Sequence, residues 1–131
     1  MRALVTGATG CVGANIVEAL LARGYEVRAL RRVTSKLDAL AGLDPEYAIG
    51  DVLDEASLRA AMAGCELVFH AAAIAQYWRN GPETIYAANV EGTRNVLRAA
   101  LAQGVGRVVF TSSVAALGVP TRRGQLLDES A

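Results

Sequence analysis

The sequence predicts an α/β fold, a doubly wound parallel sheet forming one domain over residues 1–131. Short apolar stretches alternate with helical stretches from one end to the other, which is typical of βαβ units. The stretch TGATGCVG places Gly7, Gly10 and Gly13 at intervals of three residues, between the first apolar stretch and the first helical one. The 131 residues are 53% apolar and 20% charged, enough material for one buried core.

The first predicted unit is strand, helix, strand. Residues 2–6 (RALVT) read as a buried strand, and a helix is expected over about residues 11–23, ended by Gly24. Residues 26–30 (EVRAL) are the second strand. The inward face of the helix is expected to carry Val12, Ile16, Ala19 and Leu20.

The middle of the chain repeats this alternation. A weaker helical piece around residues 35–40 precedes a short third strand at 47–49. Asp54 is a suitable N-cap and Gly64 a suitable C-terminal stop for a short helix between them. Residues 66–71 (ELVFHA) supply the fourth strand.

The last predicted unit is a long helix followed by a fifth strand. Pro82 suits the first turn of a helix that runs to about Gln103, and Gly104 ends it. Residues 107–113 (RVVFTSS) form the fifth strand. The inward side chains of the helix are expected to be Ile85, Asn89, Val96 and Ala100.

Right-handed crossovers between these strands give the order 3-2-1-4-5, a Rossmann-like sheet with helices on both faces. Ligands of such sheets bind beyond the carboxyl ends of the strands, where the strand order reverses. Gly7, Ala71 and Ser112 all fall at that edge. The sequence therefore predicts a ligand site between the first and fourth strands.

Composition excludes several classes of partner. Thirteen basic and thirteen acidic residues cancel, which argues against a nucleic-acid domain held by its net charge. The sequence contains neither an apolar run long enough to span a bilayer nor the apolar core of a signal peptide. We expect a soluble, cytoplasmic protein that binds neither nucleic acid nor membrane.

The two cysteines, Cys11 and Cys65, are too few for a disulfide framework and lack the spacing of a metal site. We expect two free, buried thiols and no metal. An alternative is a reactive Cys11, since a helix start lowers the pKa of a thiol.

The glycine loop predicts dinucleotide binding. Its first glycine allows a sharp turn, the second lets the backbone approach a pyrophosphate, and the third lets the helix pack close to the sheet. The free N–H groups at the helix start favour an anion. Glycine costs about 1 kcal/mol relative to alanine in a helix, so this spacing requires such a compensating role.

The end of the second strand favours NADP. NAD enzymes carry an acidic residue there, about twenty residues after the glycine loop, to accept the ribose hydroxyls. Here Arg31 and Arg32 occupy that place, and a guanidinium can pair with a 2′-phosphate that a carboxylate would repel. Ser35 and Lys36 could add donors. The alternatives are a solvated strand end and NAD as cofactor.

Five stretches, in order, resemble the extended short-chain dehydrogenase/reductase family. Within that family the sequence is similar to NAD-dependent epimerase/dehydratase and dihydroflavonol-4-reductase-like proteins, including the hopanoid-associated sugar epimerase group. The stretches are TGATGCVG (6–13), GDVLD (50–54), FHAAA (69–73), NVEGTRNVLRAA (89–100) and VVFTSSVAALG (108–118).

The resemblance implies cofactor contacts along the whole site. Thr9, Cys11 and Val12 would join the three glycines at the phosphates. Asp51 would bind adenine, or instead have a turn or capping role, and Val52 would pack on the ring. Ala71, Ala72 and Ala73 would lie beneath the ribose and nicotinamide, and Thr111 and Ser112 would line the cofactor.

The resemblance also assigns chemistry. Ser113 would be the catalytic serine that hydrogen-bonds the reacting carbonyl or hydroxyl. Asn89 would support the site, or be a buried amide bonded to a neighbouring strand. His70, the only histidine, is interpreted as a packing residue and not as a base.

The family's YxxxK pair is missing from these 131 residues, and Lys36 is the only lysine. That pair supplies the acid/base tyrosine, and the lysine lowers its pKa. We therefore expect these residues to be the amino-terminal part of a longer enzyme, without the later strands and substrate lobe. Alone, the chain would bind nucleotide without turnover.

The sequence is compatible with two functions. The first is an NADP-dependent reductase or a sugar-nucleotide epimerase/dehydratase, moving hydride between the nicotinamide and the alcohol or ketone of a small-molecule substrate. The second is a non-catalytic NAD(P)-binding module with a sensing or assembly role. The loop 75–81 (AQYWRNG) could meet a substrate or partner, or simply pack. The unpaired edge of the fifth strand could promote self-association.

Overall fold

The computed structural model describes residues 1–130, which form a five-stranded parallel sheet in the order β3-β2-β1-β4-β5. The predicted strand order is therefore confirmed. The strands are β1 (Arg2–Thr6), β2 (Glu26–Arg31), β3 (Glu46–Ile49), β4 (Leu67–His70) and β5 (Arg107–Phe110). The α-helices are α1 (Cys11–Leu21), α2 (Glu55–Met62), α3 (Pro82–Tyr86) and α4 (Gly92–Ala102). The other helical segments are the 3₁₀ turns η1 (Asp38–Leu40) and η3 (Val114–Leu117) and the π turn η2 (Ala87–Glu91).

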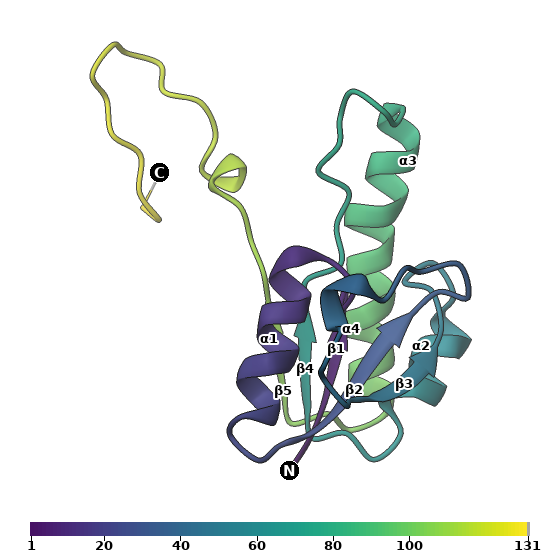
Figure 1. The fold of residues 1–131 in the computed structure, drawn as a ribbon. Helices are drawn as coiled ribbons and strands as arrows, with labels where there is room; N and C mark the ends of the chain where they lie inside the picture. Colours follow the sequence, from purple (N-terminus) through teal and green to yellow (C-terminus); the bar gives the residue numbers. More distant parts are fainter. Residues whose placement is uncertain (131) are drawn as a thin grey trace.

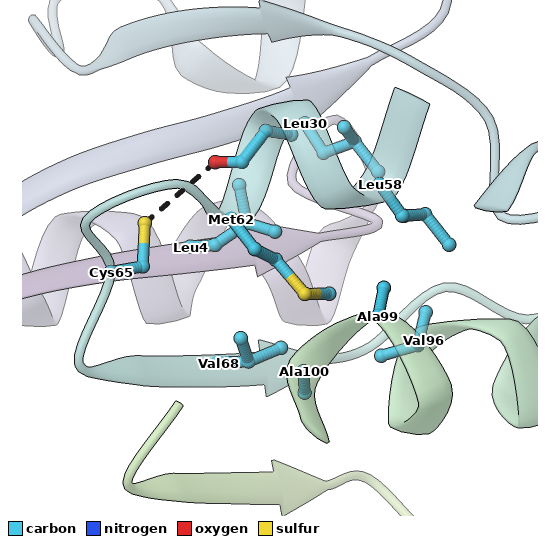
Figure 2. Packing of buried hydrophobic residues seen from close by; sticks show 10 residues of the cluster. Leu4, Leu30, Leu58, Met62, Cys65, Val68, Val96, Ala99 and Ala100 are labelled. Carbon is cyan, nitrogen blue, oxygen red and sulfur yellow. Dashed lines mark hydrogen bonds between the residues drawn. The ribbon is translucent and has the colours of Figure 1, made fainter. Parts of the chain in front are cut away.

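Helices cover both faces of the sheet, so the core has two halves (Figure 1). Along β1, side chains alternate between the halves because successive residues of a strand point to opposite faces. Ala3 and Val5 pack toward α1 and η1. Leu4 packs against α2 and α4, in the half that Figure 2 shows with Met62 and Val96. The first strand is thus buried on both sides.

The inward face of α1 differs from the prediction. Val12 is 51% exposed and Ala19 is also exposed, whereas Gly13, Ala14, Val17 and Leu20 are buried. The reason is the third glycine of the loop. Gly13 packs directly on the backbone of Gly7, which fixes the rotation of the helix and turns Val12 outward.

The long helix after β4 is also not continuous. The predicted helix is present from Pro82 to Ala102, but residues Ala87–Glu91 form a π turn in its middle. Such turns insert one extra residue into a helix and occur often at functional sites. Asn89, one of the predicted site residues, lies within this turn.

The fifth strand is shorter than predicted and ends at Phe110, not at Ser113. Phe110 pairs with His70, the last residue of β4, so the ladder stops where its partner stops. From there the chain extends away from the body of the domain (Figure 1). Residues 111–113 therefore lie outside the sheet.

The cysteines confirm one half of the prediction. Cys65 is buried and free, and burial raises the pKa of its thiol. Cys11 is free but exposed, so the prediction of a buried thiol is wrong there. Cys11 starts α1 on the side away from the sheet, because the neighbouring Gly13 occupies the inward position.

Strand β5 forms one edge of the sheet, and its Val109 and Phe110 side chains are 43% and 52% exposed. We expect the chain to self-associate through this edge, since unpaired strand edges recruit further strands. Light scattering over a wide concentration range should show a mass that rises with concentration. The mass of a single chain at every concentration would contradict this expectation.

Within residues 1–130, none of the helices combines the length and apolarity that crossing a membrane would require.

Candidate functional site

A cavity of about 670 Å³ opens at the carboxyl ends of the strands, beside the predicted switch between β1 and β4. This volume lies within the range of small-molecule and cofactor sites. The cavity brings together most of the residues predicted to bind a cofactor. Those that line it are Gly7, Thr9, Gly10, Arg31, Arg32, Ser35, Asp51, Val52, Ala71, Ala72 and Ala73.

Two of the three loop glycines, Gly7 and Gly13, are required by the packing of the fold, whether or not a ligand binds. Gly7 has a φ of +68°, and a Cβ there would lie 2.6 Å from the carbonyl of Ala71. A Cβ on Gly13 would lie 2.1 Å from the carbonyl oxygen of Gly7. Both contacts are with backbone, which cannot move aside cheaply. These glycines set the turn and bring the helix start close to the ends of β1 and β4.

Gly10 is different. It has a φ of −93°, which any residue adopts, and the nearest atom to an added Cβ is the Gly7 carbonyl oxygen at 3.4 Å. The fold therefore has room for a side chain at this position, and Gly10 lines the cavity. Its missing side chain leaves space on the cavity side, where the backbone can approach a ligand.

The N-terminus of α1 favours an anion in the cavity on electrostatic grounds. Gly10 is the N-cap and has no side chain that could accept a hydrogen bond from the first turn. At α2, in contrast, the Asp54 carboxylate accepts from the N–H of Ala56 at 3.0 Å. The first N–H groups of a helix lack intrahelical acceptors and carry a partial positive charge. At α1 they remain available to a ligand.

The basic end of the cavity is formed where β2 ends. The guanidinium of Arg31 lies over the ring of Tyr47, 5.7 Å from its centroid, and this cation–π contact helps to fix the position of the arginine side chain. The Ser35 hydroxyl accepts a hydrogen bond from the backbone N–H of Arg32 at 3.0 Å. This contact folds the chain after β2 so that Arg31, Arg32 and Ser35 line the same cavity.

Asp51 has the turn role that the sequence offered as one alternative. Its Oδ1 accepts from the N–H of Leu53 at 3.0 Å, an Asx turn, while its own N–H donates to the Ser57 hydroxyl at 3.1 Å. Asp51 also lines the cavity. Its binding of adenine stays a prediction.

The Asn89 amide is bonded as the alternative interpretation expected, but Asn89 is half-buried and its partner is the segment after β4, so the prediction of a buried amide bonded to a strand is wrong. Its Oδ1 accepts from the N–H of Ile74 at 2.7 Å, and its Nδ2 donates to the carbonyl of Ile74 at 3.0 Å. Both backbone groups of Ile74, which lines the cavity, are thereby held. The π turn thus fixes the course of the chain that follows β4.

His70 is 1% exposed and is bonded through both ring nitrogens. Its Nδ1 is 2.6 Å from the Thr6 hydroxyl and its Nε2 is 2.9 Å from the Thr93 hydroxyl. The ring also stacks on Phe110, with centroids 5.4 Å apart. Burial lowers the pKa of His70 to about 4. The imidazole is therefore neutral near neutral pH.

This pKa predicts acid sensitivity of the fold. The unfolded chain binds a proton at His70 near pH 6.5 and the folded chain only near pH 4, so unfolding takes up a proton between these values. Stability should fall as the pH drops, by about 2 kcal/mol at pH 5 from this group. Urea unfolding of wild type and His70→Gln at several pH values measures this loss. An equal pH dependence in both proteins would contradict the prediction.

Besides Asn89 and the exposed Lys36, six predicted residues lie outside the cavity lining among the residues described. Gly13 is buried beneath Gly7, while Cys11 and Val12 face outward on the first turn of α1. Thr111, Ser112 and Ser113 are exposed, because the chain leaves the sheet after Phe110. The Ser113 Oγ accepts from the N–H of Ala115 at 3.2 Å and caps a short turn. Their cofactor and catalytic roles stay predictions.

Part of the cavity lining was not predicted from the sequence. The strand ends were a usable signal for the positions after β2 and β3, because parallel strands bring their carboxyl ends to one edge. The wall formed by α3 and η2 could have been found from the small and polar residues that recur at helical spacing after Pro82, because such a spacing places them on one face of the helix. The missed residues are Leu30, Gly50, Leu53, Ile74, Glu83, Thr84, Ala87 and Ala88.

Comparison with known proteins gives three kinds of similarity. A family model described as "NAD dependent epimerase/dehydratase family" matches residues 3–131. Sterol demethylase protein B of Methylococcus capsulatus is 47% identical over 119 residues, which are 91% of this chain and 36% of that protein. Cinnamoyl-CoA reductase 1 of Oryza sativa subsp. japonica is 45% identical over 135 residues, 96% of this chain and 39% of the reductase.

Among solved structures, the UDP-glucose 4-epimerase of Thermus thermophilus in complex with NAD has a TM-score of 0.85 and 32% identity. The match covers 99% of this chain and 43% of the epimerase. The chain therefore spans between 36% and 43% of the length of these three proteins.

Proposed function

Because this chain belongs to the NAD dependent epimerase/dehydratase family, we propose that it binds NAD(P) as part of an oxidoreductase or a sugar-nucleotide epimerase/dehydratase. When bound, the nicotinamide would accept or donate hydride, and the substrate would be an alcohol or ketone. The residues of this chain would hold the coenzyme and keep it oriented. The reaction would need groups that these residues do not contain, since YxxxK is missing from the sequence.

The observation that carries the proposal is the space at Gly10. A cavity wall without a side chain lies next to helix N–H groups that the protein leaves uncapped, which suits a pyrophosphate. Ala71, Ala72 and Ala73 form the adjoining wall with side chains that stop at Cβ. They would leave room for the ribose and nicotinamide.

For the adenosine end we propose NADP, with NAD as the alternative. What supports NADP is the group Arg31, Arg32 and Ser35, which offers two guanidinium groups and a hydroxyl at one end of the cavity. An arginine can donate two parallel hydrogen bonds to a phosphate. Solved structures of similar fold hold NAD, among them the Thermus thermophilus epimerase. Direct comparison of both coenzymes is therefore required.

Titration calorimetry with NADPH and NADH tests the proposal. Folded protein should bind at least one of them, and NADPH more tightly if the two arginines bind the 2′-phosphate. Absence of heat with both coenzymes would refute the proposed function. Tighter binding of NADH would refute the NADP assignment and leave the rest intact.

The second candidate function is a non-catalytic NAD(P)-binding module with a sensing or assembly role. A native protein that comprised only these 131 residues would favour it, because the acid/base pair YxxxK would then be absent. The mass of the protein in its natural source separates the two candidates. A mass close to that of the longer relatives would favour the enzyme, and a mass equal to this chain would favour the module.

A further inference from the structure

A chain of hydrogen bonds runs through the protein next to the cavity. The Thr6 hydroxyl is 2.6 Å from Nδ1 of His70, and Nε2 of His70 is 2.9 Å from the Thr93 hydroxyl. That hydroxyl donates to the carbonyl of Asn89 at 2.7 Å. The Asn89 amide in turn holds both backbone groups of Ile74. The chain therefore links β1, β4, α4, the π turn and the segment after β4.

The direction of each bond follows from the donors and acceptors. The Asn89 carbonyl can only accept, so Thr93 uses its hydroxyl proton there. The Thr93 oxygen can then only accept from His70, which must carry its proton on Nε2. Nδ1 is left as an acceptor and receives the Thr6 hydroxyl proton. A neutral His70 with Nε2–H thus satisfies every bond in the chain.

Three of the four side chains in this hydrogen-bond chain, Thr6, His70 and Asn89, adjoin segments of the cavity wall, and the fourth, Thr93, connects His70 to Asn89. Thr6 precedes Gly7, and His70 precedes the wall at residues 71–73. Asn89 follows Ala87 and Ala88 of the π turn, which line the opposite wall. The hydrogen bonds therefore set the distance between the glycine loop, the segment after β4 and the helix across from it.

We infer that His70 and Thr93 are positioning residues for the nucleotide. Without touching it, they hold the glycine loop, the segment after β4 and the π turn at fixed positions relative to one another. This inference rests on the proposed function. The His70 ring, at the end of β4, is bonded to Thr6 of β1 on one side and to Thr93 of α4 on the other, so it connects these three elements. Thr93 is central to this arrangement because its single hydroxyl accepts a hydrogen bond from His70 and donates one to the carbonyl of Asn89.

The first test needs no ligand. Thr93→Val keeps the shape of the side chain and removes the hydroxyl, while Thr93→Ser keeps the hydroxyl. Hydrogen exchange at the Ile74 N–H should quicken about tenfold or more in the valine variant and stay near wild type in the serine variant. The N–H of Val5 in the core of β1 reports any global loss of stability. Equal exchange of Ile74 in all three proteins would overturn the inference.

The second test asks whether the hydrogen bonds through His70 and Thr93 affect nucleotide binding in the cavity. The Kd for NADPH should rise about tenfold in Thr93→Val and be restored in Thr93→Ser, as measured well below the unfolding temperature. Val96→Ala is the matched control, since it removes buried packing from the same helix without touching the hydrogen-bond chain. It should lower stability and leave the Kd unchanged.

The outcomes separate the two ideas. An unchanged Kd in a folded Thr93→Val protein, or an equal rise in Val96→Ala, would overturn the positioning role. Failure of the proposed function would instead appear as wild-type protein that binds neither NADPH nor NADH. Heteronuclear NMR of His70 gives an independent check, because the inference requires the proton on Nε2 and a proton on Nδ1 would contradict it.

Discussion

Replacing Gly10 by alanine should leave the fold intact and weaken nucleotide binding by about 10- to 100-fold. The nearest atom to the new Cβ would be the Gly7 carbonyl oxygen at 3.4 Å, an ordinary contact, and the backbone at Gly10 suits any residue. Loss of a glycine N-cap and the reduced freedom of the unfolded chain nearly offset each other, so stability should change by less than about 1 kcal/mol. The methyl group would instead occupy the space expected for the pyrophosphate.

Gly13→Ala is the matched contrast. Its Cβ would lie 2.1 Å from the Gly7 carbonyl oxygen and 2.8 Å from the Cα of Ala8, both backbone atoms. Either α1 must move away from the sheet or the loop must distort, at a cost of about 3 kcal/mol or more. Urea unfolding and calorimetry on both variants provide the comparison. Tight nucleotide binding by Gly10→Ala would show that the loop does not hold the pyrophosphate.

Changing Arg31 to Asp together with Arg32 to Ala should reverse the coenzyme preference. The double variant loses two guanidinium groups at the end of β2 and gains a carboxylate that repels a 2′-phosphate and accepts from ribose hydroxyls. We expect the ratio of NADPH to NADH affinity to fall about 100-fold, corresponding to about 2.7 kcal/mol. NADPH binding by the wild type should also weaken with added salt, because exposed charges are screened.

A second arginine pair provides the control for this experiment. Arg122 and Arg123 are also adjacent, and they lie in the exposed segment after β5, outside the cavity. Arg122→Asp with Arg123→Ala changes the net charge equally. It should leave both affinities unchanged. An equal loss in the control would assign the effect to long-range charge, and an unchanged ratio in the Arg31 variant would refute the NADP assignment.

The sequence was sufficient for the strand order and for most of the cavity. Alternating strands and helices, with right-handed crossovers, leave few topologies, and the ends of the helices before β2 and β5 follow from local signals, Gly24 and Gly104. Because parallel strands end at one edge, residues such as Gly7, Arg31 and Ala71 could be placed together from the strand pattern alone. These predictions depend only on the course of the backbone.

The errors have a different origin. The rotation of α1 follows from one contact, Gly13 on Gly7, which overrides the hydrophobic pattern that favoured Val12. The end of β5 at Phe110 follows from the length of β4, a property of its partner. Apolar periodicity describes one segment at a time, so it cannot report contacts between segments.

For this protein the sequence by itself determined the order of the sheet, the glycine loop and the basic end of β2. Only the tertiary structure decided that Gly7 and Gly13 are required by packing while Gly10 leaves open space in the wall of the cavity. It also decided that His70 bridges Thr6 and Thr93. The physical reason is that strand order and turn chemistry depend on neighbours in sequence, whereas free space and paired hydrogen bonds depend on atoms brought together from distant segments.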